Sequence, residues 1–99
     1  MRVIWSDLAI EDLREIEEYI ARDNPERAIS FIMELLDYGD SLGIEGQTRK
    51  GTPAKWIDNS NVRELYYDKY TIVYEITDHT IEIHEIHNSA KLSRHFQEE

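Results

Sequence analysis

Cysteine is absent from this 99-residue chain. Its absence excludes disulfides and thiolate metal sites, so we expect a reducing compartment. Long apolar runs are also missing, so the sequence predicts no segment that crosses a bilayer. The N-terminal residues lead directly into a charged amphipathic segment, which does not resemble a signal peptide. With 40% hydrophobic residues, we expect one globular domain over residues 1–99, in the cytoplasm.

Basic residues are scarce. The chain has 11 Lys and Arg against 21 Asp and Glu, a formal net charge of −10. Residues 1–42 hold four basic and eleven acidic residues (net −7), whereas residues 43–99 hold seven and ten (net −3). Binding to nucleic acid depends on cations that neutralise phosphates. An anionic partner should therefore meet the C-terminal half, at segments 46–57 and 86–97, where basic residues occur without acidic ones.

Two helices are predicted in the first half. Apolar residues at helical spacing predict a helix from about Asp7 to Arg22, with Ser6 as its N-cap. Asn24 then suits a second N-cap and Pro25 suits the first helical position. Gly43 is predicted to be the C′ residue of this second helix. Because the connection is short, the two helices should form an antiparallel hairpin.

Strands are predicted at residues 2–5, 62–67, 70–77 and 80–87, with turns at 68–69 and 78–79. Alternation predicts that one face of the central strand lies on the helices, with Tyr70, Ile72, Tyr74 and Ile76. Residues 44–60 read as a long loop from which Trp56 and Ile57 return to the core. The tail is expected to add a helical turn at residues 90–96. The order indicates an α+β fold, an antiparallel sheet with the helical hairpin packed on one face. The pairing of the first strand stays open.

This β-α-α-β-β-β order resembles the RelE/ParE toxins of bacterial type II toxin–antitoxin systems, over nearly the whole chain. Several residues carry the resemblance, in order and at family-like spacing: Trp5-Ser6, Ala9, Asp12-Leu13, Ile16, Tyr19-Ile20, Asp23, Pro25, Ala28, Arg63-Glu64-Leu65, Tyr70-Thr71-Ile72-Val73-Tyr74, His87, Leu92 and Arg94.

The resemblance implies a plasmid stabilisation-type toxin component that arrests growth and is neutralised by a protein antitoxin wrapped around it. RelE-like members cut mRNA on the ribosome as metal-independent endoribonucleases, whereas ParE-like members poison DNA gyrase and are not enzymes. The resemblance implies one of these activities without choosing between them. No cofactor, metal or membrane is implied, and a homodimer or a hetero-oligomer with the antitoxin is open. We expect an antitoxin helix in a groove between the helix pair and the sheet.

A metal-independent ribonuclease needs a proton acceptor, a proton donor and cations on the phosphate. Arg63 stands where the family has a phosphate-binding arginine, on the strand face that carries Leu65, and Arg63→Ala is expected to leave the fold intact. His87 could serve as acid or base. Lys91 is a hypothetical third catalytic residue. Further target contacts are expected from the loop and the tail, by Lys50, Lys55 and Arg94.

Each candidate also has a structural interpretation. Arg63 could pair with Glu82 or Glu64 instead of a phosphate, and His87 could be a hydrogen-bonded structural residue. Simple alternation sends His84 and His87 to opposite faces, so they are not expected to share a metal ion. Nuclease members often carry a basic residue three positions after the strand-terminal histidine, where this chain has Ala90. That departure and the acidic charge favour the ParE-like branch, or a degenerate toxin fold that only binds a protein partner. An unrelated small α+β domain is a third interpretation.

Overall fold

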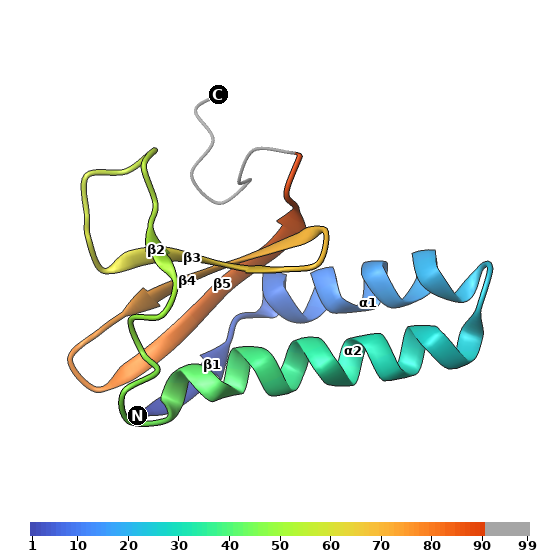
Figure 1. The fold of residues 1–99 in the computed structure, drawn as a ribbon, viewed down its shortest axis with the longest axis horizontal. Helices are drawn as coiled ribbons and strands as arrows, with labels where there is room; N and C mark the ends of the chain where they lie inside the picture. Colours follow the sequence, from blue (N-terminus) through green and yellow to red (C-terminus); the bar gives the residue numbers. More distant parts are fainter. Residues whose placement is uncertain (91–99) are drawn as a thin grey trace.

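The computed structural model describes residues 1–90. Its elements run in the order β1 (Arg2–Trp5), α1 (Asp7–Ala21), α2 (Pro25–Asp40), the 3-10 turn η1 (Ser41–Gly43), β2 (Thr52–Pro53), β3 (Val62–Tyr67), β4 (Tyr70–Ile76) and β5 (Thr80–Asn88). The two helices lie side by side as a hairpin against one face of a five-stranded sheet (Figure 1). The predicted α+β class is confirmed, and the helical turn expected at 90–96 falls almost wholly outside the described residues.

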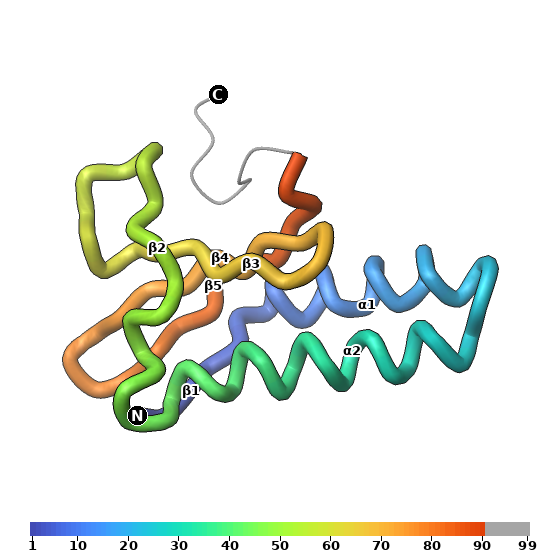
Figure 2. The backbone as a smooth tube through the Cα atoms, in the orientation of Figure 1, coloured from blue at the N-terminus to red at the C-terminus, as the bar shows by residue number. Residues whose placement is uncertain are grey.

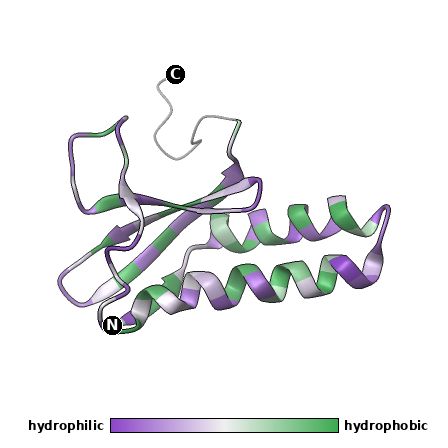
Figure 3. Cartoon of the chain, viewed as in Figure 1, coloured by the Kyte–Doolittle hydropathy of each residue, from purple (hydrophilic) through white to green (hydrophobic). Residues whose placement is uncertain are grey.

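The predicted helix starts are confirmed. Ser6 Oγ accepts a hydrogen bond from the Ala9 amide at 3.0 Å, and Asn24 Oδ1 accepts one from the Arg27 amide at 3.0 Å. Pro25 occupies the first turn of α2, where its missing N–H leaves no bond unmade. Bands of hydrophobic and hydrophilic residues follow one another along both helices (Figure 3). This pattern is expected of helices that pack one face on a core.

The end of α2 differs from the prediction for Gly43. The helix passes at Ser41 into η1, whose Ile44 amide donates to Ser41 O, and Gly43 does not adopt a positive φ. The N-terminus explains the glycine, because a Cβ at Gly43 would collide with Met1 O. The Met1 amine donates to Gly43 O at 2.7 Å, which brings the N-terminus beside the end of α2 (Figure 2). This position therefore needs glycine for a close approach rather than for a helix cap.

The sheet has the strand order β1-β5-β4-β3-β2. Strands β3, β4 and β5 pair antiparallel as predicted. Residues of the predicted loop form β2, a short edge strand that pairs antiparallel with β3. The first strand, whose pairing the sequence left open, lies parallel to β5 with Val3 opposite Ile81. The sheet is therefore mixed, and the prediction of an antiparallel sheet is correct only for the pairs among β2, β3, β4 and β5.

The core lies between the helices and the sheet. Ile72 and Tyr74 are fully buried in it, and Tyr70 and Ile76 pack against it, so the predicted core face of β4 is confirmed. A second, smaller cluster on the other side of the sheet joins Ile57 to Ala54, Val62 and Val73. None of the described helices is both long and apolar enough to cross a membrane.

A β-bulge interrupts β5. Val73 stands opposite Glu85 and Tyr74 stands opposite Ile83, so His84 is an extra residue in the ladder. The bulge keeps both Ile83 and Ile86 in the core, where simple alternation would have placed Glu85. His84 and His87 consequently share the sheet face that points away from the helices, which we call the open face. The prediction that these histidines face opposite sides was wrong, because it assumed an unbroken period of two.

Candidate functional site at the sheet and its covering loop

Arg63 lies on the core side of the sheet. It stands opposite Tyr74 in β3–β4 pairing and shares its strand face with Leu65, as predicted, but only 8% of its surface is exposed. Its guanidinium donates to three backbone carbonyls, those of Ser60 (3.1 Å), Arg49 (3.2 Å) and Gly51 (2.7 Å). These bonds tie residues 49–60 to the sheet. Neither expected carboxylate, Glu64 or Glu82, is among its partners in the described chain.

Tyr74 completes the same attachment. Its hydroxyl donates to Thr48 O at 2.9 Å and accepts from the Gly51 amide at 3.2 Å. Burial raises the pKa of Tyr74, and the bonds from Gly51 and Arg63 act in the opposite direction. A Cβ at Gly51 would lie 2.7 Å from Glu64 O, so the backbone fits here only as glycine. We call Arg63, Tyr74 and Gly51 the loop latch, which sequence reasoning missed because its acceptors are backbone atoms.

His87 lies on the open face, opposite Thr71. Its Nδ1 is 3.2 Å from Glu85 Oε1, and the two side chains are 8% and 0% exposed. Nearby, the hydroxyls of Thr71 and Ser89 are 2.9 Å apart. His87 therefore sits beside a buried carboxylate, and the sheet separates it from Arg63. The structure does not bring together Arg63 and His87, two of the three residues predicted to carry catalysis.

The predicted cations are dispersed. Lys50 Nζ donates to Ser41 Oγ at 2.6 Å and lies 4.4 Å from the centre of the Tyr38 ring, at the end of α2. Lys55 is exposed and makes no hydrogen bond or ion pair with a described residue. Lys91 and Arg94 lie outside the described residues. The described loop lysines thus do not surround His87 with phosphate-binding groups.

The open face is acidic. On this face, strands β3, β4 and β5 carry no Lys or Arg. They carry four glutamates there: Glu64, Glu75, Glu82 and Glu85. Glu64 accepts from Trp56 Nε1 at 3.1 Å and from the Tyr66 hydroxyl at 3.0 Å. Trp56 was expected in the core, but it is 39% exposed, and this bond joins its indole to Glu64. Within the described chain, only Glu75, Glu82 and His84 gather closely enough to hold a metal ion.

The comparisons with known proteins agree on one fold. Residues 3–92 match the family model described as the ParE toxin of the type II toxin–antitoxin system parDE. The solved chromosomal ParDE toxin–antitoxin system of P. aeruginosa contains a similar chain, at 21% identity and a TM-score of 0.75, covering 89% of this chain and 95% of that one. A chain of the toxin–antitoxin complex RelBE2 from Mycobacterium tuberculosis is similar at 18% identity and a TM-score of 0.61, covering 88% and 95%. No functionally curated protein sequence matches.

Proposed function

This chain belongs to the ParE toxin family of type II toxin–antitoxin systems, and from that premise we propose that it arrests growth by acting on DNA gyrase in the cytoplasm. Cleavage of mRNA on the ribosome is the rival activity among RelE/ParE toxins. The observation that carries the proposal is the separation of Arg63 and His87 by the sheet.

A ribonuclease must place an acid or base and a phosphate-binding cation around one scissile phosphate. Arg63 already donates to three backbone carbonyls from a buried position. Transfer of its guanidinium to a phosphate would leave those carbonyls without a donor, at a cost of the order of 1–3 kcal/mol for each buried group. Among the described residues, the charged group beside His87 is the Glu85 carboxylate and not a Lys or Arg. The positions of Arg63 and His87 therefore favour a protein target over an RNA target.

The electrostatics of the open face point the same way. Its three partly exposed glutamates, Glu64, Glu75 and Glu82, would repel the phosphates of an mRNA strand laid across it. A protein surface can instead complement an acidic face with Lys and Arg. A gyrase-directed toxin needs recognition of this kind and no catalytic constellation of its own.

Neutralisation by a protein antitoxin is the second part of the proposal. The interface between the helices and the sheet, where a docking groove was expected, is filled by core residues such as Phe31, Leu35 and Ile83. The exposed apolar residues of α2 are a better docking surface: Ile29 and Met33 are 58% and 60% exposed and lie one turn apart on one helix face. An apolar antitoxin segment bordered by basic residues would match this surface and its acidic surroundings.

The test is to induce the protein alone in a bacterium and to follow pulse-labelled DNA and protein synthesis. We expect DNA synthesis to fail first. We also expect purified protein to inhibit supercoiling by purified gyrase. His87→Gln should keep both effects, with His79→Gln in the exposed β4–β5 turn as its matched control.

Two outcomes would contradict the proposal. Protein synthesis that stops first, with the effect lost in His87→Gln but kept in His79→Gln, would indicate mRNA cleavage with His87 as a catalytic residue. Normal growth in the presence of soluble, folded protein would favour the alternative, a non-catalytic toxin fold that only binds a protein partner.

A further inference from the structure

Two carboxylates face each other directly on the open face. Glu75 of β4 is the cross-strand partner of Glu82 of β5. Like charges in this position repel and destabilise the pair of strands. Glu82 is partly buried, and it makes no hydrogen bond or ion pair with any described residue. The repulsion at this position is therefore not balanced by a Lys or Arg of the described chain.

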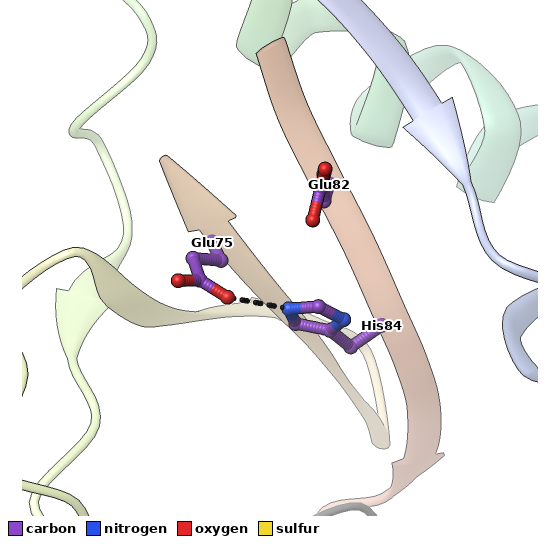
Figure 4. Close-up of side chains that lie close together, drawn as sticks. All are labelled: Glu75, Glu82 and His84. Atoms are coloured by element: carbon purple, nitrogen blue, oxygen red, sulfur yellow. Dashed lines mark hydrogen bonds and ion pairs between the residues drawn. The ribbon is translucent and has the colours of Figure 1, made fainter. Parts of the chain in front are cut away.

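An imidazole approaches the same two carboxylates. His84 lies two residues after Glu82 in β5, and its Nε2 is 2.9 Å from Glu75 Oε1. Figure 4 shows Glu75 and His84 reaching toward one another across the two strands, with Glu82 on the same strand as His84. One nitrogen or oxygen from each of the three residues lies within 4.8 Å of the others. The side chains of His84 and Glu75 are 15% and 32% exposed, so the group is partly shielded from water.

We propose that Glu75, Glu82 and His84 bind a divalent transition-metal cation, with Zn²⁺ as the best match. Zn²⁺ accepts imidazole nitrogen and carboxylate oxygen at about 2.0–2.2 Å, which places tetrahedral ligand atoms about 3.3 Å apart. The three donor atoms lie within 4.8 Å of one another, so ion binding would change their separations by about 1.5 Å at most. Mg²⁺ and Ca²⁺ fit less well because they prefer oxygen ligands alone. Three protein ligands leave a fourth position of the Zn²⁺ for water.

The bulge at His84 is compatible with this arrangement. His84 shares the open face with Glu82, two residues earlier, and the bulge returns Ile86 to the core after it. A bound cation would replace the Glu75–Glu82 repulsion by attraction and would join β4 to β5. Since β5 also carries the parallel partner β1, the ion would strengthen the centre of the sheet. This proposal does not depend on the identity of the toxin's target.

Calorimetric titration of the untagged, chelator-stripped full chain with Zn²⁺ tests the site. We expect about one Zn²⁺ per chain to bind. Glu82→Gln and His84→Gln should each weaken binding roughly a hundredfold or more, because loss of a ligand exceeds the typical effect of losing a residue that supports one. His79→Gln is the matched control and should change nothing. Wild-type affinity should fall on acidification, because a ligating imidazole must be unprotonated.

Absence of saturable Zn²⁺ binding would overturn the proposal. Binding that Glu82→Gln and His84→Gln leave unchanged would also overturn it, because the ion would then lie elsewhere in the chain. Circular dichroism of both variants checks the fold. Glu82→Gln keeps the side-chain shape and removes a like charge, so it should fold even if His84→Gln does not, and its titration then decides alone.

Discussion

At the scale of single residues, Arg63 shows how the same side chain can serve recognition or folding. A buried guanidinium needs acceptors, since an unpaired buried charge is costly. Arg63 finds three of them in the carbonyls of Ser60, Arg49 and Gly51. Alternation predicted its strand face correctly. Alternation carries no information on whether a covering loop or a phosphate supplies the acceptors.

We predict that Arg63→Ala lowers the free energy of unfolding by about 2–3 kcal/mol, because one buried and two partly buried carbonyls lose a charged donor. The sequence predicted only that the variant keeps its fold, and the contacts of Arg63 add this loss of stability to that prediction. Urea unfolding followed by circular dichroism measures the effect. Arg14→Ala is the control, since the Arg14 side chain is 70% exposed and its only ion pair among described residues, to Glu11, spans 3.7 Å. Equal midpoints for the two variants would show that the loop latch contributes little.

At the scale of elements, α2 and β1 meet at Gly39. A Cβ built there would lie 2.5 Å from Trp5 Cη2 and 2.6 Å from Trp5 Cζ2. Trp5 cannot easily retreat, because its Nε1 donates to Asp40 Oδ1 at 2.8 Å. The glycine thus allows the indole to lie directly on the helix backbone.

We predict that Gly39→Ala destabilises the protein by about 1–3 kcal/mol through overpacking. In an open helix the same change would stabilise by about 1 kcal/mol, because alanine has the higher helix propensity. Thermal unfolding of Gly39→Ala, Trp5→Leu and the double variant measures the effect. Gly39→Ala should lower the stability less in the Trp5→Leu background than in the wild-type background, because the smaller leucine leaves room for the added Cβ. If Gly39→Ala is more stable than the wild type, Trp5 does not pack tightly on the backbone of α2.

The elements also show what the sequence could and could not predict. Both N-caps, Ser6 and Asn24, are confirmed because a cap is a local pattern. The parallel pairing of β1 and the short β2 edge depend on contacts between distant segments, which local patterns do not encode. The bulge at His84 had a signal, the isoleucine spacing of two and then three residues from Ile81 to Ile86. Its neglect placed His84 and His87 on opposite faces, whereas Glu82 and His84, two residues apart, share a face under simple alternation as well.

At the scale of the whole molecule, the net charge of −10 acts on every carboxylate. Between described residues, two Lys/Arg–carboxylate ion pairs are present: Arg14–Glu11, which is largely exposed, and Arg27–Glu34, which is about half exposed. Exposed pairs contribute little, so screening them removes little stability. Self-repulsion of a strongly charged chain destabilises its compact state. Added salt should therefore stabilise this protein.

We predict that the thermal midpoint rises as NaCl increases from about 0.02 M to about 0.5 M, which shortens the screening length from about 20 Å to about 4 Å. The matched variant is Glu15→Gln/Asp37→Asn, at two exposed helix positions, which changes the net charge from −10 to −8. It should start with a higher midpoint at low salt and gain less from added salt, because less repulsion remains to be screened. Equal gains for both proteins would contradict self-repulsion as the cause, since a salt effect on apolar burial would not depend on these two charges. A midpoint that falls with salt would instead mean that attractive charge pairs dominate, and the acidic helices would then have to be balanced by the cations of the C-terminal half.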